Sequence, residues 1–447
     1  MLKHASGFSN RIFLTPLPSP IVHPGSTQTV TLTPVGPGGP MIVDGQGHVV
    51  WFHQLQLPEV AGNLRIQHYA GKPVLTWWQG PVTVAAYGLG EGVIADTRYR
   101  TLHVVHAGNG YAMDIHEFSL TPEGDALFTV YAPVLVHLPG TPPGTLTSLI
   151  DAIVQEVDVR TGLVTWEWHA LGHIPLRDSY ATPANSAFYD AFHINSIQPL
   201  ARGRVLISSR DASAVYELDR ATGHILWTLG GKASDFRMAR GARFWFQHDA
   251  ALRSGNRVSL FDDGAGPPQR EPASRGLILA LDLRRHVARM DRQYRRSNDT
   301  SAQSEGSLQM LPGGDAFAGF GATPYFSQFT NAGKLVFDAS LPADDGSYRV
   351  YSFPWSTTPT TKPAVAAQRV DPSTVAVYAS WNGATTVARW QVLAGAGAGS
   401  LQPVGTAARR TDFETRIDVP SSAPAFAVRA LDGRGHVLAT SPVATVS

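Results

Sequence analysis

Two stretches of the sequence, VQEVDVRTGLVTWEW at residues 154–168 and VYELDRATGHILWTL at residues 215–229, are nearly the same pattern written twice. Each has an alternating apolar segment, an Asp–x–x–Thr–Gly turn and a second segment that carries Trp166 or Trp227. Alternation with a period of two predicts β-strands, and a short Gly-containing turn between two such runs predicts a β-hairpin. One hairpin is therefore expected to recur along the chain.

Weaker copies of the same pattern occur before and after these two stretches. The turns of the six copies stand at Asp44, Asp96, Asp158, Asp219, Asp282 and Asn331. They are spaced by about 50 to 60 residues, roughly the size of a four-stranded unit. The spacing predicts an all-β fold with a six-bladed β-propeller over residues 41–355. Residues 1–40 are expected to be an extended segment that pairs with the C-terminal domain or helps to close the propeller.

The composition of the sequence changes after the last copy of the hairpin. The stretch SFPWSTTPTTKPAVAA at residues 352–367 is rich in Pro and Thr, and residues 356–367 are predicted to be a linker. Residues 368–447 contain short alternating strands, which predict a small fibronectin III or Ig-like β-sandwich. Its core is expected to contain Trp381, Trp390, Phe413 and Phe426.

The composition excludes several classes of function. The chain has 36 basic and 35 acidic residues, a net charge of +1, and no basic run, so neither nucleic acid nor an anionic membrane is expected as a partner. The absence of cysteine excludes disulfides, thiolate zinc sites and a cysteine nucleophile. No apolar run is long enough to span a membrane, and no signal peptide is visible. We expect a cytoplasmic protein, or an exported one if the sequence is incomplete at its N-terminus; nothing indicates the oligomeric state.

Three histidines precede the Gly-containing turn of their repeats: His116 in MDIHEF, His193 in AFHINSI and His248 in WFQHDA. Equivalent positions of propeller blades are related by rotation about one axis, so three histidines at one phase would converge on a single pocket. His193 and Asn195 alternate along a predicted strand and should share a face. Arg210 ends the following strand, RVLISSR. A guanidinium, imidazoles and an amide together suit a tetrahedral oxyanion.

Four segments together resemble the PAPS-independent arylsulfate sulfotransferases. They are HINS at residues 193–196, SSRD at residues 208–211, the TGxxxWxLGG pattern from Thr222 to Gly231, and QHDA at residues 247–250. The resemblance covers about residues 20–355. It implies a six-bladed propeller that moves a sulfuryl group from a phenyl sulfate to a phenol through a sulfohistidine. The absence of cysteine and of an evident export signal departs from many members of that family.

The resemblance also implies roles for single residues. His248 matches the nucleophile, and His193 with Asn195 matches a pair that holds the sulfate and assists the phenolic oxygen. Arg210 matches the arginine that binds sulfate oxygens, and His116 matches the remaining active-site histidine. A neutral imidazole is a competent nucleophile near neutral pH, and His116 or His193 could act as the general acid. This chemistry requires no metal, no nucleotide and no other cofactor.

Other functions are also compatible with the sequence. A quinoprotein-like propeller shares the Asp–x–x–Thr–Gly hairpin, but it should have eight repeats and a calcium site. A hydrolase could use the three histidines for zinc, although Arg210 in the same pocket would oppose a cation. The chain could also be a non-catalytic binding propeller, or a sulfotransferase-like propeller that is reused for another reaction in a biosynthetic pathway. Aromatic residues that could form a wall for an aryl substrate are Tyr111, Phe246 and Phe320.

Overall fold

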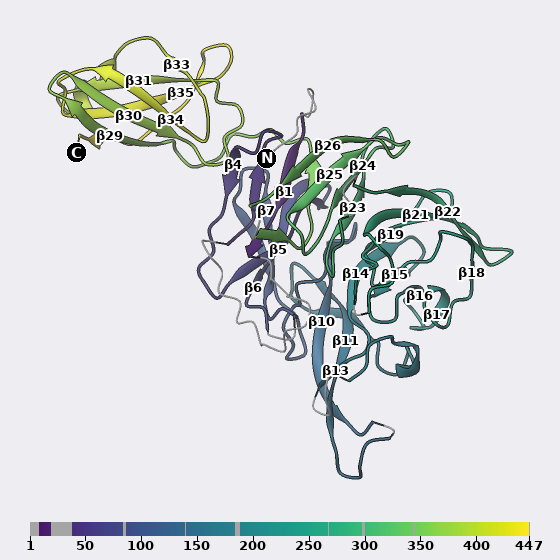
Figure 1. Cartoon of the computed structure of the whole chain (residues 1–447). Coiled ribbons are helices and arrows are strands. Elements are labelled where there is room, and N and C mark those ends of the chain that lie inside the picture. The colour runs from purple at the N-terminus through teal and green to yellow at the C-terminus, as the bar shows by residue number, and fades with distance from the viewer. Residues whose placement is uncertain are drawn as a thin grey trace.

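The computed structural model describes residues 9–18, 38–83, 86–138, 140–183, 188–266, 268–296, 300–342 and 345–446. These residues form an all-β protein, as predicted, with two short 3₁₀ helices, η1 (Leu176–Asp178) and η2 (Ala398–Ser400). Among them, no helix has the length and apolarity that crossing a membrane requires. The strands fall into a large part, up to β28, and a smaller C-terminal part (Figure 1).

Six sheets, called I to VI, contain most of the described residues of the large part. In each sheet, four strands lie side by side as hydrogen-bonded neighbours and are counted from a first to a fourth strand. Sheet I consists of β5 (Val60–Tyr69), β6 (Lys72–Gly80), β7 (Glu91–Asp96) and β8 (Thr101–Val105). Sheet II consists of β9 (Phe118–Leu120), β10 (Asp125–Val136), β11 (Thr147–Asp158) and β12 (Val164–His169), with β13 (Phe188–Asp190) beside β11. Sheet III consists of β14 (Ile194–Leu200), β15 (Arg204–Ser209), β16 (Ala214–Asp219) and β17 (Ile225–Gly230).

The remaining sheets follow the same plan. Sheet IV consists of β19 (His248–Arg253), β20 (Arg257–Asp262), β21 (Arg275–Asp282) and β22 (Val287–Tyr294), with β18 (Arg237–Met238) beside β22. Sheet V consists of β23 (Ser307–Met310), β24 (Ala316–Gly319), β25 (Tyr325–Phe329) and β26 (Leu335–Ser340). Sheet VI consists of β28 (Tyr351–Phe353), β1 (Arg11–Leu14), β3 (Met41–Val43) and β4 (Val49–Phe52).

The recurring hairpin is confirmed, because each of the six predicted turns joins the third and fourth strands of one sheet. In the turn between β11 and β12, the Asp158 carboxylate accepts hydrogen bonds from the Thr161 backbone N–H (2.7 Å) and hydroxyl (2.9 Å). Asp219 and Thr222 repeat these bonds at 2.9 and 3.0 Å between β16 and β17. The Asp–x–x–Thr–Gly pattern thus fixes the turn by side-chain to backbone bonding.

The first strands of the six sheets contact one another in a closed order, β5, β9, β14, β19, β23, β28 and again β5. Side-chain amides tie neighbouring first strands together. Gln198 of β14 accepts a hydrogen bond from the Leu252 N–H (2.6 Å) and donates to its carbonyl (3.3 Å), and Gln309 bonds Ser352 in the same way. These bonds satisfy backbone groups that a first strand would otherwise leave unpaired at its sheet edge.

Sheet VI joins the two ends of the large part. β28 pairs with β1, where Ile12 lies opposite Ser352, and β1 pairs in turn with β3. A second small ribbon pairs β2 (Pro16–Pro18) with β27 (Asp345–Ser347). The N-terminal segment that was expected to be extended therefore contributes a strand to the last sheet. Antiparallel pairing of β28 with β1 therefore joins segments from the two ends of the large part in one sheet.

Two antiparallel sheets form the C-terminal part. One contains β29 (Ala364–Asp371), β30 (Thr374–Ser380) and β34 (Glu414–Pro420). The other contains β31 (Arg389–Gly395), β32 (Gln402–Pro403), β33 (Ala408–Arg409), β35 (Ala425–Leu431), β36 (Val437–Thr440) and β37 (Ala444–Thr445). Trp381, Trp390 and Phe426 are buried in one core, as predicted, whereas Phe413 lies outside it.

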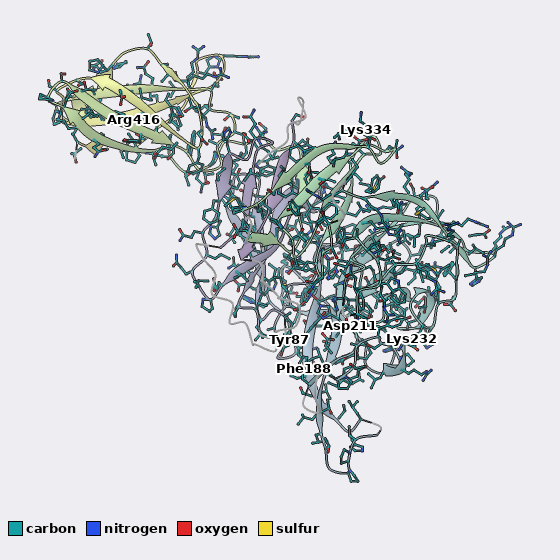
Figure 2. The ribbon with its side chains drawn as sticks, in the orientation of Figure 1. Tyr87, Phe188, Asp211, Lys232, Lys334 and Arg416 are labelled. Carbon is teal, nitrogen blue, oxygen red and sulfur yellow. The ribbon has the colours of Figure 1, made fainter. Side chains whose placement is uncertain are left out.

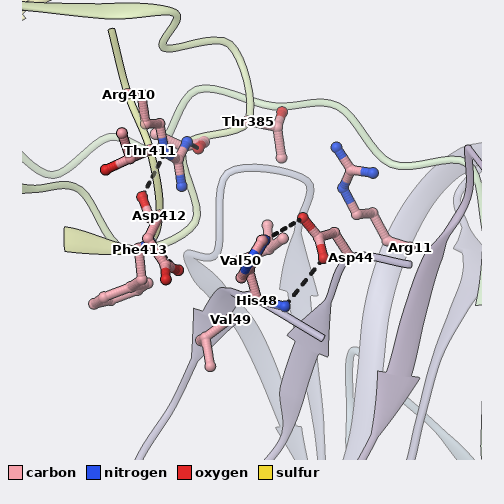
Figure 3. Close-up of a pocket in the computed structure, with 11 residues that line it drawn as sticks. Arg11, Asp44, His48, Val49, Val50, Thr385, Arg410, Thr411, Asp412 and Phe413 are labelled. Atoms are coloured by element: carbon pink, nitrogen blue, oxygen red, sulfur yellow. Dashed lines mark hydrogen bonds and ion pairs between the residues drawn. The ribbon is translucent and has the colours of Figure 1, made fainter. Parts of the chain in front are cut away.

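Phe413 lines a pocket of about 140 Å³ between sheet VI and the C-terminal part (Figure 3). The β3–β4 turn lines it from the other side with Asp44 and His48. Beside it, Gly383 N–H donates to the Val50 carbonyl (2.8 Å), and the Tyr99 hydroxyl donates to the Gly383 carbonyl (3.0 Å). Polar groups rather than a large apolar surface join the two parts at this contact.

Candidate active site

His248 is the first residue of β19 and is buried. Its Nε2 accepts a hydrogen bond from the backbone N–H of Glu305 (3.2 Å), and its Nδ1 lies 2.7 Å from Oδ2 of Asp263. A backbone N–H only donates, so Nε2 carries the lone pair and Nδ1–H donates to Asp263. Burial, followed by the positive charges of Arg210 and His193, lowers the pKa of His248 well below its usual value. The ring is therefore neutral and presents a nucleophilic nitrogen at neutral pH.

His193 lies between two carboxylates. Asp190 accepts from its backbone N–H (3.1 Å) and lies 2.7 Å from its Nδ1. Burial alone would lower the pKa of His193, but the negative charge of Asp190 and the hydrogen bond to it outweigh burial, with a smaller effect from Asp211. The pKa is therefore raised, and His193 is the histidine of the cluster that most readily carries a positive charge.

His116 packs against His193, with 4.6 Å between their ring centroids. Asp114 lies 2.6 Å from its Nδ1, and the ring of Tyr131 stacks on it at 5.2 Å. Burial lowers the pKa of His116 despite the charge of Asp114. Tyr348 lies beside both His116 (5.5 Å) and His248 (6.2 Å) and so links the three histidines into one cluster.

The prediction that all three histidines share one phase is wrong for His193. In β19 the pairing register shifts after His248, and in β14 it shifts after Ile194. Counted back from the paired turn residues, Arg253 with Arg257 and Leu200 with Arg204, the position of His248 is taken by Asn195, and His193 stands two residues earlier. It enters the cluster because its backbone adopts a left-handed φ of 48°. Such β-bulges and positive φ values redirect side chains that plain alternation would place elsewhere. For the same reason His193 and Asn195 do not simply share a strand face.

Arg210 follows β15 and borders the cluster. Its Nη1 donates to Asp211 (2.7 Å), its Nη2 donates to the Gln303 carbonyl (3.1 Å), and the guanidinium lies 5.1 Å from the ring centre of Phe246. Of the three aromatic residues that were predicted to form a wall for an aryl substrate, Phe246 therefore contacts the site. Phe320 instead packs on Phe261 in the core, and Tyr111 packs in the core between sheets I and II.

Asn195 is completely buried, and the structure places it between two sheets. Its Nδ2 donates to the Gln247 carbonyl (2.7 Å), and Asn63 makes the same kind of bond to the Ile115 carbonyl (2.5 Å). Each of these carbonyls belongs to the residue directly before a histidine of the cluster. Asn195 thus orients the backbone at His248. Its Oδ1 is buried and finds no hydrogen-bond partner among the described residues.

A charge network lies directly beside the cluster. Arg349, fully buried, donates to the carbonyls of His116 (3.1 Å) and Asn195 (2.6 Å) and pairs with Glu117 (3.0 Å). Arg65 pairs with the same carboxylate. The positive charges of Arg349 and Arg65 outweigh burial and lower the pKa of Glu117 to about 2. This network holds in place the backbone that carries two site residues.

Several residues in and around the histidine cluster were not predicted from the sequence: Asp114, Asp190, Asp263, Glu305, Tyr131, Tyr348 and Arg349. A signal existed for some of them, because an aspartate stands two residues before His116 and three before His193. Asp263 is distant from His248 in the sequence and is brought to it only by the β19–β20 pairing. Figure 2 shows Asp211 near the base of the β10–β11 hairpin, with Tyr87 and Phe188 in the same region.

One group of side chains in the described residues could hold a cation. Ligand atoms of Asp190, His193 and Asp211 lie within 4.8 Å of one another. Asp211, however, already pairs with the Arg210 guanidinium, and Asp190 lies at hydrogen-bond distance from His193. A permanent cation beside these carboxylates competes with a metal for the same negative charge.

Comparison with known proteins places the chain in a family. Similar solved structures include a protein of unknown function from Bacteroides caccae (11% identity, 77% of this chain and 99% of that chain, TM-score 0.44). Another is hydrazine synthase from Kuenenia stuttgartiensis (11% identity, 66% and 80%, TM-score 0.27). These scores are too low to support a conclusion about fold or function, and the search of curated proteins found no match. The sequence model of arylsulfotransferases (ASST) matches residues 65–341, more than half of the chain. The chain therefore belongs to the arylsulfotransferase family.

Proposed function

We propose that this chain is an arylsulfate sulfotransferase that moves a sulfuryl group from a phenolic sulfate ester to a phenol through a sulfohistidine on His248. The observation that carries the proposal is the Nε2 lone pair of His248, which Asp263 orients from the other side of the ring. Attack by Nε2 would place a positive charge on the ring; burial raises the pKa of Asp263 well above its usual value, and the positive ring that forms would favour its carboxylate and be stabilised by it. Family membership supports an arylsulfotransferase-like reaction.

We infer that the six sheets are the blades of a β-propeller over about residues 41–355, closed by β1 of the N-terminal segment. The closed order of contacts among the first strands supports this inference. We likewise infer that residues 356–367 are a linker and that residues 368–447 form a fibronectin III or Ig-like sandwich, which the two-sheet core supports. In a propeller the first strands surround the axis, so the histidine cluster would lie on it.

His193 and Arg210 are proposed to bind the sulfuryl oxygens. In a transfer of this kind, negative charge is spread over the equatorial oxygens, and fixed cations stabilise it. His193 is favoured as a cation by Asp190, and Arg210 is permanently charged. His116, stacked on Tyr131, would complete the wall of the pocket on which an aryl group packs.

The test is incubation with 4-nitrophenyl sulfate, with and without a phenol. We expect nitrophenol release that continues only when the phenol is present, together with a sulfated phenol. Without the phenol, release should stop after about one equivalent, and the protein should gain the mass of a sulfuryl group. A folded protein that turns over none of a wide panel of aryl sulfates would contradict the proposal and favour a reused or non-catalytic propeller.

Removing the carboxylate beside His193 should shift the pH profile. The raised pKa of His193 keeps the ring cationic at higher pH, and the cation is lost as the pH rises through that pKa. In Asp190→Asn the pKa should fall, so the alkaline limb of kcat/KM should move to lower pH. Asp432→Asn, which removes the partner of exposed His436, is the control and should leave the profile unchanged. An unchanged profile in Asp190→Asn would rule out a cationic role for His193.

Arg210→Lys should lower kcat/KM for 4-nitrophenyl sulfate by about 10²-fold, because a lysine keeps the charge but loses the planar fork that fits sulfate oxygens. Steady-state kinetics with the donor varied measures the effect. Arg416→Lys is matched, since Arg416 also pairs with a nearby aspartate (Asp418, 3.0 Å) but lies in the C-terminal part. Equal kinetics of Arg210→Lys and Arg416→Lys would exclude Arg210 from sulfate binding.

A further inference from the structure

The loop before β23 brings Glu305 to the nucleophilic nitrogen. The backbone N–H of Glu305 donates to Nε2 of His248 (3.2 Å), and the residue adopts a left-handed φ of 71°. A non-glycine residue at positive φ costs free energy and persists only where its surroundings impose it. The surroundings of Glu305 therefore hold it in this conformation beside the candidate nucleophile.

Neighbouring backbone holds this loop in place. Gly306 N–H donates to the Tyr348 carbonyl (3.0 Å), and Ala322 N–H donates to the Ser304 carbonyl (3.0 Å). Gly321 packs so closely that a Cβ there would lie 2.2 Å from the Ser304 carbonyl oxygen and 2.7 Å from the Glu305 carbonyl carbon. Only glycine fits at position 321, so the position of Glu305 is built into the fold.

The carboxyl group of Glu305 is not committed to any structural bond. No hydrogen bond or ion pair to it exists within the described residues, although its side chain is only partly exposed. The charged and titratable groups around it are His248 of β19, Asp263 after β20 and Tyr348 before β28, and Arg210 reaches the same loop at Gln303. Burial raises the pKa of Glu305 to about 7.

The other carboxylates near the histidines are occupied. Asp263 binds Nδ1 of His248, Asp114 binds Nδ1 of His116, and Asp190 binds Nδ1 of His193. Each of them binds Nδ1 of its own ring, so Asp263 lies on the side of His248 opposite Nε2. On the Nε2 side, the contact to His248 comes from the backbone N–H of Glu305, and its carboxyl group interacts electrostatically with Asp263 and Tyr348, which places that carboxyl near the ring.

We propose that Glu305 is the acid–base residue that carries the phenolic proton in both half-reactions; this rests on the proposed sulfuryl transfer through His248. In the first half-reaction the Nε2 lone pair gives up the hydrogen bond from the Glu305 N–H and forms a bond to sulfur, and the bond from sulfur to the aryl oxygen breaks. The electron pair stays on that oxygen, which takes the proton of the Glu305 carboxyl. In the second, the acceptor hydroxyl attacks sulfur, the S–N electron pair returns to Nε2, and the phenolic proton passes to the Glu305 carboxylate. The cycle leaves Glu305 protonated, as at its start.

A group with a pKa near the working pH suits this exchange, because both of its forms are populated. The two half-reactions should then depend on pH in opposite directions. Donor cleavage needs the protonated form and should slow as the pH rises through about 7, most clearly for a donor with a poor leaving group. Transfer to a phenol needs the carboxylate and should accelerate over the same range.

The test separates the half-reactions in Glu305→Gln. With 4-nitrophenyl sulfate, whose leaving group needs little protonation, the first-turnover burst should stay within a few-fold of the wild type. Transfer from the sulfo-enzyme to unsubstituted phenol should fall by about 10²- to 10⁴-fold and lose its rise with pH. Unsubstituted phenyl sulfate as donor should suffer a loss of similar size. Glu305→Asp should recover part of the rate, and Glu123→Gln, on an exposed turn, is the control.

The outcomes are distinguishable. If Glu305→Gln is folded, as judged by its melting temperature, and transfers to phenol at the wild-type rate with the same pH dependence, the proton passes elsewhere and this inference is wrong. An equal loss in the 4-nitrophenol burst and in phenol transfer would assign Glu305 to positioning His248 through its N–H. A wild-type protein that forms no sulfo-enzyme would overturn the proposed function, and the role of Glu305 with it.

Discussion

Replacing His248 with alanine should abolish sulfuryl transfer, with a fall in kcat of at least about 10⁴-fold, because removal of a nucleophile leaves only binding and electrostatic contributions. No sulfuryl adduct should then appear in the intact mass of the protein after incubation with 4-nitrophenyl sulfate. The lone pair of Nε2 is the atom that the proposed reaction consumes and restores, so no neighbouring imidazole should replace it.

Two further variants make this result interpretable. His248→Ala leaves Asp263 buried without its partner, which could disturb folding. His248→Asn retains an N–H group that can donate to Asp263, and it should be equally inactive while keeping the wild-type melting temperature. His436→Ala, at an exposed histidine of the C-terminal part, should be fully active. If His248→Asn retains a rate within tenfold of the wild type, the sulfuryl group is carried by another residue.

Glu117→Gln should have the largest effect on stability. Glu117 is the common partner of Arg349 and Arg65, and removing its charge leaves two buried guanidinium groups without full compensation. Breaking a buried ion pair on one side typically costs about 3–5 kcal/mol, and we expect a loss of this size in the free energy of unfolding. Urea denaturation of the wild type and of Glu117→Gln at neutral pH measures this loss, with Glu123→Gln as the exposed control.

The same carboxylate should contribute to acid denaturation. Its pKa is lowered from the ordinary 4.5 to about 2, so its contribution to stability is complete above pH 4.5 and is lost as the pH falls from there towards 2. Glu117→Gln should therefore lose less stability over this range than the wild type. A change in unfolding free energy below about 1 kcal/mol, the value of an exposed pair, would show that the network does not depend on Glu117.

Much of the fold could be predicted from local patterns in the sequence. The two Asp–x–x–Thr–Gly turns could be predicted because each closes through bonds between residues three positions apart, and the four weaker copies followed from their spacing. The core of the C-terminal part followed from its large aromatic residues, except for Phe413, which instead lines the pocket beside sheet VI. Pairing across the two ends of the large part could not be predicted, since β1 and β28 show no local sign of being partners.

The candidate site shows the same division. The repeat and the family resemblance pointed to His116, His193, His248, Arg210 and Asn195, and the structure brings the three histidines and Arg210 together around one cluster. The position of His193 could not be derived from alternation, because it lies two residues before the position equivalent to His248, next to a β-bulge and with a left-handed φ. Asn195 turned out to bond the backbone of the next sheet, a contact with no counterpart in its own segment.

For this protein, residue identity established which side chains can react, because the chemistry of an imidazole or a guanidinium is a property of the residue itself. The protonation state and the position of these side chains depended on neighbours that lie far apart in the chain. These neighbours are Asp263 beside His248, Glu305 on its Nε2, and Arg349 on the carbonyls of His116 and Asn195. The physical reason is that pKa values and hydrogen bonds respond to distances of a few ångströms in space. Separation along the chain does not report those distances, and pairing between sheets sets them.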